Sequence, residues 1–137
     1  MGGSDRGRAG QGRRDLVDSL IFDAGVFIAV ENPSQRRVVL ALVERMQAEG
    51  VEPVTNDAAL AQAWRDPARQ VPMAILVKAT TVYPFGDPRV IGRRCGIAGT
   101  SDVVDASLAV LADQLDMTIV TTDPADMARL DVAFREL

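Results

Sequence analysis

The sequence predicts a single α/β domain built around a mainly parallel β-sheet. Short apolar segments of strand character alternate with segments of helical periodicity over nearly the whole chain after Leu16, and this alternation is typical of a parallel sheet. The chain has 137 residues, of which 47% are apolar, and that is enough material for one proper core. There is no internal repeat and no linker, so we expect one domain over residues 16–137.

Residues 1–15 are expected to precede this domain as a disordered basic leader. They are mainly Gly, Arg and Ser with almost no apolar content, a composition that cannot build a core. Four arginines against two aspartates give this segment a net charge of +2, whereas the whole chain carries −4. The leader is either a basic arm for RNA or a segment without function, and we favour the second interpretation.

The first half of the domain reads as two strands and three helices. The apolar run Ser19–Phe22 is the first predicted strand, and Val26–Glu31 follows it with one or two helical turns. Asn32-Pro33-Ser34 ends these turns and caps a longer helix, Gln35–Glu49, in which apolar residues recur at helical spacing. The remaining predicted elements of this half are the strand Glu52–Thr55 and the helix Ala58–Arg65.

The second half repeats the alternation. Its first elements are the helix Met73–Ala79 and the strand Thr81–Tyr83. Asp87-Pro88 is an N-cap followed by a proline at the first helical position, so it predicts the helix Arg89–Cys95. The later elements are a helix that begins at Asp102 and carries an apolar stripe to Leu115, the strand Thr118–Val120, and the helix Ala125–Leu130. We assign no structure to Asp131–Leu137.

Composition excludes several classes of site. The chain has no histidine and one cysteine, Cys95, which rules out Ser-His-Asp and Cys-His catalysis, a His- or Cys-rich zinc site, and an internal disulfide. There is no apolar run of the roughly 20 residues that span a bilayer and no signal-peptide pattern, so we expect a soluble, cytoplasmic protein. The acidic body argues against broad nonspecific nucleic-acid binding, but it is compatible with a metal-dependent nuclease.

Aspartates follow two of the predicted strands and open one of the predicted helices. Asp23 ends the first strand, and Asp123 follows the last strand, with Thr121 at the strand end and Asp126 just beyond. Asp102 and Asp105 are three residues apart in the first turn of the acidic helix, so they project from one face. Because the carboxyl ends of parallel strands face the ligand-binding crevice of such folds, we expect these carboxylates to converge.

Converging carboxylates point to metal chemistry. Asp23, Asp102, Asp105 and Asp123 would repel one another, so that either a pKa rises or a cation enters. Oxygen ligands without His or Cys select Mg²⁺ or Mn²⁺. The matching reaction is phosphodiester hydrolysis, in which the metal polarises the phosphoryl oxygen and acidifies the attacking water, and a carboxylate such as Asp105 receives the proton.

Each of these residues also has a purely structural interpretation. Asp102 and Asp105 would favourably meet the helix dipole in a first turn. Asp123 before a proline is a typical N-cap, and the structural interpretation of Asp126 is an ordinary solvated charge. Asp23 is the hardest to explain in this way, because it ends a strand of buried type with little else polar nearby. The set as a whole favours a functional site.

Four segments, in order, carry a family resemblance: IFDAGVFIAVE, ALAQAWRDPARQ, GTSDVVDASLAVLA and VTTDPADMARL. With these segments the chain resembles the PIN-domain ribonucleases, and most closely the VapC-type toxins of toxin–antitoxin modules. The resemblance covers nearly everything after Leu16. It implies a three-layer α/β/α sandwich, a Mg²⁺- or Mn²⁺-dependent endoribonuclease, a homodimer, and inhibition by a cognate antitoxin.

The resemblance also assigns roles by position. It implies that Asp23 and Asp105 are the acids after the first strand and at the start of the late helix, with Asp102 as a companion. It further implies that Asp123 and Asp126 form the last acidic motif, with Thr121 as its hydroxyl.

Three features depart from the family pattern, and the basic leader over residues 1–15 is one of them. Many VapC-type toxins have a glutamate where this sequence has Gln62, and a neutral amide would support metal-bound water but add no charge. The segment VTNDAAL is also polar at Asn56 and Asp57, where an apolar stretch is usual.

A basic segment follows Gln62 and is a candidate for RNA binding. Arg65 and Arg69 are four residues apart and would contact an RNA phosphate, with Trp64 offering a stacking face. The alternative is that Trp64 belongs to the core and the arginines pair with nearby aspartates. Arg93 and Arg94 form a second basic pair, which we interpret as solvated surface.

Two further functions compete with the nuclease. A catalytically silent PIN domain that binds only RNA or protein would explain Gln62 and the acidic body. A phosphoacceptor signalling domain is the weaker alternative, because it usually needs paired acids after the first strand and a late lysine, whereas the only lysine here is Lys78, in mid-chain. The RNA target cannot be read from the sequence.

Overall fold

The computed structural model describes residues 19–66 and 70–137. The leader predicted over residues 1–15 and the candidate RNA contact Arg69 therefore lie outside the described residues. The strands are β1 (Leu20–Phe22), β2 (Val54–Asn56), β3 (Thr81–Tyr83), β4 (Thr118–Thr121) and β5 (Phe134–Glu136). The helices are α1 (Ala24–Ala29), α2 (Pro33–Ala48), α3 (Asp57–Ala63), α4 (Val71–Lys78), α5 (Pro88–Ala98), α6 (Val103–Leu115) and α7 (Pro124–Arg129).

The sheet is entirely parallel, with strand order β3-β2-β1-β4-β5. Parallel strands direct all their carboxyl ends to one edge of the sheet, so the residues that follow each strand gather there. Phe22 of β1 is in register with Val120 of β4, so the next residues along the chain, Asp23 and Thr121, lie side by side at this edge. The register thus places the first predicted acid beside the last predicted motif.

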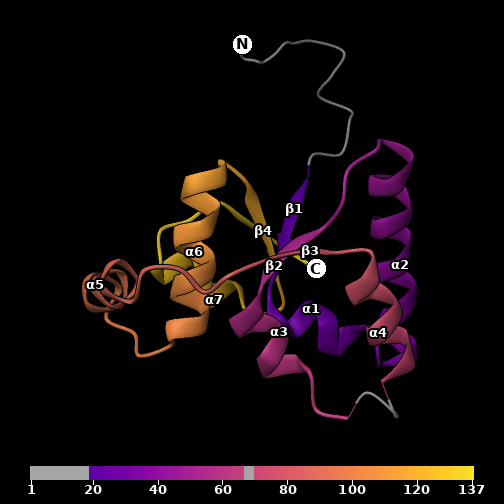
Figure 1. Cartoon of the computed structure of the whole chain (residues 1–137), viewed down its shortest axis with the longest axis horizontal. Helices are drawn as coiled ribbons and strands as arrows, with labels where there is room; N and C mark the ends of the chain where they lie inside the picture. The colour runs from indigo at the N-terminus through magenta and orange to yellow at the C-terminus, as the bar shows by residue number, and fades with distance from the viewer. Residues whose placement is uncertain (1–18, 67–69) are drawn as a thin grey trace.

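Helices cover both sides of the sheet. Figure 1 shows α5 and α6 on one side of the strands, α2 and α4 on the other, and α1 and α3 near the carboxyl ends of the strands. The central strand β1 is buried along its whole length, as expected for a strand covered on both faces. The predicted three-layer α/β/α sandwich is confirmed.

The core is continuous across these layers. Phe22 of β1 and Phe27 of α1 pack edge to face, with ring centroids 6.1 Å apart, a favourable aromatic geometry. The largest fully buried side chains come from every layer and include Phe22, Phe27, Met46, Met73, Leu108, Ile119 and Met127. Packing on this scale fixes the sheet edge that carries the acidic residues.

Side-chain caps start most of the helices. The predicted caps Asn32 and Asp87 accept hydrogen bonds from the backbone N–H groups of Ser34 and Arg89, respectively. The same device starts the helices that follow the strands, where the capping side chains are Asp23, Asn56 and Asp123, and it also starts α6, where the cap is Asp102. Asp and Asn are favoured at this position because they satisfy helix N–H groups that have no partner within the helix.

Two differences from the sequence prediction have clear physical causes. The unassigned segment at the C-terminus contains β5, whose sequence Phe-Arg-Glu is largely polar and exposed, so apolar periodicity could not reveal this edge strand. Helix α5 continues beyond Cys95 to Ala98 and ends where Gly99 adopts φ +71°, a left-handed conformation that glycine accepts without a Cβ penalty.

In the part of the chain that the structure describes, no single helix is long and apolar enough to cross a membrane. Helices α5 and α6, which meet at 106°, are together long and apolar enough, judged by length and composition only. Helix α6 lies in the core, with six of its residues buried, and buried core helices commonly have such an apolar composition.

Candidate functional site

Asp23 is a buried carboxylate held from three directions at the carboxyl edge of the sheet. It is only 4% exposed. Its Oδ1 accepts a hydrogen bond from the Val26 backbone N–H at 3.1 Å, and its Oδ2 accepts one from the Thr121 hydroxyl at 2.5 Å. A longer bond of 3.3 Å comes from the backbone N–H of Thr122. Burial raises the pKa of Asp23, and these hydrogen bonds oppose that rise.

Glycine is needed at position 25 to keep this arrangement. A Cβ at Gly25 would lie 1.8 Å from the Thr122 Oγ1 and 3.2 Å from the Asp23 Oδ1. The space left by the missing side chain therefore holds the hydroxyl of Thr122. This close approach brings the start of α1 against the end of β4 next to the Asp23 carboxylate.

Three further carboxylates form the acidic cluster, defined here as Asp102, Asp105 and Asp126. One carboxylate oxygen of each lies within 4.8 Å of the others, and all three side chains are partly buried. Asp102 and Asp105 come from the start of α6 and Asp126 from the first turn of α7. The cluster therefore depends on how these two helices are placed against each other.

The electrostatics of the cluster are dominated by Asp105. Burial, followed by the carboxylate of Asp102, raises the pKa of Asp105 from 3.8 to about 8. Smaller contributions come from the charges of Asp23 and Asp126, so Asp23 acts electrostatically on the same site. Without a cation, Asp105 holds a proton at neutral pH, because burial and the neighbouring carboxylates make its ionisation costly.

Capping hydrogen bonds fix the rotamers of the acidic residues. The Asp102 Oδ1 accepts the Asp105 backbone N–H at 2.9 Å, and the Asp123 Oδ1 accepts the Asp126 backbone N–H at 3.3 Å. The backbone N–H of Asp123 donates to the Thr121 hydroxyl at 2.8 Å. Thr121 thus connects Asp23 to the turn that carries Asp123 and leads into α7.

Asp123 is placed differently from the other predicted ligands. It is exposed and serves as the N-cap of α7, which is the structural interpretation left open by the sequence. Asp126, predicted in a supporting role, occupies the cluster beside Asp102 and Asp105. Its Oδ1 also lies 3.5 Å from the guanidinium of Arg129, a cation that the sequence analysis did not single out.

The described candidate contacts in and after α3 are all exposed. Gln62 is exposed on α3 and is not a member of the carboxylate group. Trp64 is 36% exposed, so of the two interpretations left open by the sequence, a place in the core is excluded. Arg65 is exposed, and its backbone N–H is bound by the side chain of Gln70.

A buried polar pair that the sequence analysis missed connects α3 to α6. The Asn56 Nδ2 donates to the Ser107 hydroxyl at 2.8 Å, and the Ala59 backbone N–H donates to the Asn56 Oδ1 at 2.9 Å. Ser107 is two residues after Asp105 on α6. The unusual polarity of VTNDAAL was the available signal, and the structure explains it because Asn56 caps α3 and holds α6.

The residues present fit a divalent cation. Capping uses one oxygen of Asp102 and leaves the other for a ligand bond, and the close carboxylates repel one another until a cation neutralises them. An all-oxygen donor set of two or three carboxylates is typical of Mg²⁺ or Mn²⁺. Asp102, Asp105 and Asp126 would hold such an ion.

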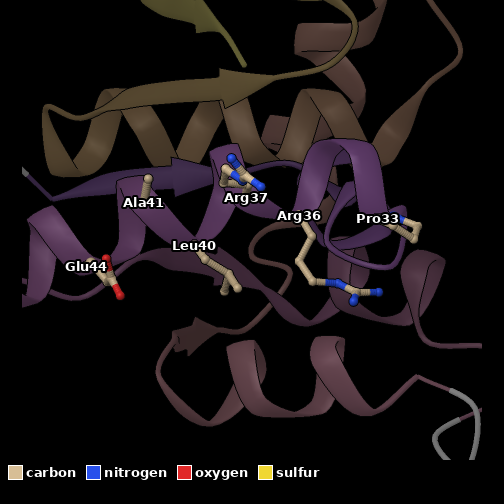
Figure 2. Close-up of a pocket in the computed structure, with 6 residues that line it drawn as sticks. All are labelled: Pro33, Arg36, Arg37, Leu40, Ala41 and Glu44. Atoms are coloured by element: carbon tan, nitrogen blue, oxygen red, sulfur yellow. The ribbon is translucent and has the colours of Figure 1, made fainter.

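Two hollows in the described part of the chain are lined by residues outside the acidic cluster. One of about 370 Å³ is lined by residues of α2: Pro33, Arg36, Arg37, Leu40, Ala41 and Glu44 (Figure 2). Arg36 is occupied there, since its Nε donates to the Val30 carbonyl at 2.8 Å. A second hollow of about 120 Å³ lies between Tyr83–Asp87 and α6. Neither contains the acidic cluster.

Comparisons with known proteins agree on the fold. No protein-family model matches the sequence, and no curated protein matches it either. Among solved structures, VapBC2 from Rickettsia felis bound to a promoter DNA fragment matches with a TM-score of 0.67 and 12% identity, covering 87% of this chain and 98% of that one.

Two other solved structures give similar values. FitAcB from Neisseria gonorrhoeae matches with a TM-score of 0.63 and 16% identity, covering 84% of this chain and 95% of that one. PAE2754 from Pyrobaculum aerophilum matches with a TM-score of 0.64 and 15% identity, covering 86% and 83%. At these identities the likeness establishes a shared fold.

The chain is thus an α/β protein of PIN-like fold, with an acidic cluster at the carboxyl edge of its parallel sheet. The predicted resemblance to VapC-type proteins is confirmed at the level of this fold, since VapBC2 is among the structural neighbours.

Proposed function

We propose that the protein is a divalent-metal-dependent endoribonuclease that acts in the cytoplasm as the toxin of a toxin–antitoxin pair. The observation that carries the proposal is the acidic cluster, in which oxygens of Asp102, Asp105 and Asp126 lie within 4.8 Å of one another beside the buried Asp23. A site of this kind on a fold shared with VapBC2 favours phosphodiester hydrolysis over other reactions.

The acidic residues of the chain have different proposed roles. Asp102, Asp105 and Asp126 would hold Mg²⁺ or Mn²⁺, which when bound polarises a phosphoryl oxygen and acidifies the attacking water. Asp23 is fixed by Thr121 and Val26, so it presents its charge to the cluster without moving. In the metal-free protein, burial and the neighbouring Asp102 raise the pKa of Asp105, and the Asp105 oxygen that a bound ion leaves free would accept the proton of the attacking water.

Asparagine substitutions test this activity. Asp105→Asn and Asp126→Asn should each reduce Mn²⁺-dependent RNA cleavage by a factor of about 100 or more, the scale of lost general-base or metal-ligand function. Asp116→Asn is the matched control, since Asp116 is an exposed aspartate at the C-terminal end of α6 with φ +56°, a conformation that asparagine tolerates. Normal cleavage by Asp105→Asn, or no cleavage by the wild type, contradicts the proposal.

A cognate antitoxin and a second copy of the chain are the proposed protein partners. The proposal is supported by the acidic cluster, which would attract an arginine-bearing segment, and by the structural match to VapBC2. Co-expression with the small protein encoded next to the gene should give a complex that has lost RNA cleavage, and sedimentation of the free protein should give twice the monomer mass of 14.7 kDa. A free monomer with unaltered activity in the presence of that protein would contradict both.

A catalytically silent PIN domain is the second candidate. It is favoured by Gln62, which is neutral and exposed at the position where many VapC-type toxins, which the chain resembles, have a glutamate. Calorimetry distinguishes the two candidates, because the nuclease must bind Mn²⁺ at the cluster and lose this binding on Asp105→Asn, whereas a silent domain need not bind it at all.

A further inference from the structure

Arg94 of α5 makes an extended set of polar contacts that link three helices. Its Nη1 donates to the Asp113 Oδ2 on α6 at 2.6 Å. Its Nε and Nη2 donate to the Leu130 carbonyl at 3.2 and 2.9 Å, and Nη2 also reaches the Asp131 carbonyl at 3.5 Å. The side chain is 20% exposed, so the prediction that Arg94 is solvated surface is wrong.

The carbonyls that Arg94 binds form the C-terminal end of α7. The last carbonyls of a helix have no partner within it, and α7 has only six residues, too few to be stable alone. Leu130 donates its N–H to the Asp126 carbonyl at 3.1 Å, and Asp131 follows with φ +55°. One turn of helix therefore connects the atoms that Arg94 holds to the residue that supplies the third carboxylate.

The acidic cluster needs α6 and α7 at a fixed separation, because Asp102 and Asp105 come from one and Asp126 from the other. The buried side chains of Met127 and Leu130 hold α7 against the core by packing that has no direction. The planar guanidinium fork of Arg94 adds direction, since it binds the end of α7 and Asp113 of α6 at once. Figure 1 shows that α5 and α6 lie beside each other on the same side of the sheet.

We propose that Arg94 is a positioning residue for the metal site: it sets the distance and orientation of α7 relative to α6 so that Asp126 completes the acidic cluster. The inference rests on the proposed metal-dependent function. The polar contacts of Arg94 go to Asp113 and to the carbonyls of Leu130 and Asp131, not to the carboxylates of the acidic cluster. It acts through the backbone of α7.

The test compares Arg94→Met, Arg94→Lys and the control Arg93→Met in Mn²⁺ titrations followed by calorimetry. Arg93 is the exposed neighbour on the same helix, so its replacement makes the same change in charge. Arg94→Met should weaken Mn²⁺ binding about tenfold, the lower end for residues that support metal ligands. Arg94→Lys should weaken it by a smaller factor, because an ammonium cannot reproduce the fork, and Arg93→Met should bind as the wild type does.

A double-mutant cycle separates positioning from a general loss of stability. If Arg94 acts through Asp126, then Arg94→Met should weaken Mn²⁺ binding little further in an Asp126→Asn background, where that ligand is already lost. Wild-type affinity in Arg94→Met, or full additivity with Asp126→Asn, overturns the inference. If Arg94→Met does not fold, Arg94→Lys decides, and wild-type affinity in that variant overturns it. Failure of the wild type to bind Mn²⁺ instead removes the proposed function, and the inference falls with it.

Discussion

Replacing Asp105 by asparagine should stabilise the metal-free protein near neutral pH while it removes divalent-cation binding. Asp105 is the carboxylate whose ionisation the folded state opposes most clearly, since burial and the Asp102 carboxylate raise its pKa to about 8. Asparagine has nearly the same shape but no charge, and its NH₂ group can donate to Asp102 as the protonated acid does. Function and stability are thus expected to change in opposite directions at this position.

The sign and size follow from the proton balance. The unfolded chain releases the Asp105 proton near pH 4 and the folded protein only near pH 8, because its pKa is raised to about 8, so stability is lost as the pH rises through this window. A pKa change of this size corresponds to at most about 6 kcal/mol. Asp105 is partly buried rather than enclosed, and water screens its charge, so we expect about 2 kcal/mol.

Urea unfolding in the presence of a chelator, between pH 4 and pH 8, measures this difference. Wild type and Asp105→Asn should have similar free energies of unfolding at pH 4. The variant should be more stable by about 2 kcal/mol at pH 8. Asp116→Asn, at the other end of α6, should show no such divergence. A difference that does not change with pH, or a variant less stable than the wild type at pH 8, would refute the assigned electrostatics.

Three other predictions use the same protein and assays. Mn²⁺ at about 100 times its Kd should raise the free energy of unfolding of the wild type by about 2.7 kcal/mol and leave Asp105→Asn unchanged; equal stabilisation of both would place the ion elsewhere. Gly25→Ala should destabilise by about 1–3 kcal/mol through the overlap with Thr122, although alanine in a helix normally stabilises. Thr122→Ala should restore part of this loss, and a stabilised Gly25→Ala would show that α1 and β4 separate easily. Gln62→Glu should lower the Mn²⁺ concentration needed for half-maximal cleavage, whereas an unchanged requirement would show that Gln62 is peripheral.

The sequence predicted the fold well because its separate local signals agreed with one another. Apolar runs, Asx-Pro caps and helical stripes all indicated the same alternation of strands and helices, and four of the five strands overlap their predicted ranges. The edge strand Phe134–Glu136 was not predicted, because its side chains are largely exposed and therefore show no apolar pattern. Parallel pairing then brings Asp23 next to Thr121, as the sequence led us to expect.

Local spacing could not decide which acids of the last motif face the cluster. Asp123 and Asp126 are three residues apart, and either one could cap α7 or project toward α6. The structure uses Asp123 as the cap and places Asp126 in the cluster. The role of Arg94 could not be predicted from the sequence either. Two of its three partners are backbone carbonyls 36 and 37 residues away along the chain, and every residue has a backbone carbonyl, whatever its side chain.

The acidic residues serve the fold and the site with different atoms. Asp23 and Asp102 each commit one carboxylate oxygen to capping the helix that follows. This bond fixes the rotamer and so presets where the rest of the carboxylate lies. The repulsion that remains is the cost of holding the site ready before a cation arrives.

Asparagine keeps this capping bond, because it is as good an N-cap as aspartate. It removes only the charge. An alanine at Asp102 would lose the cap as well, about 1 kcal/mol of helix stability, and would mix the two roles. If Asp102→Asn keeps the stability of the wild type and loses Mn²⁺ binding, while Asp102→Ala loses Mn²⁺ binding and about 1 kcal/mol of stability, capping and metal binding are separate functions of one side chain. If Asp102→Asn unfolds the protein, the charge itself supports the fold and this division is wrong.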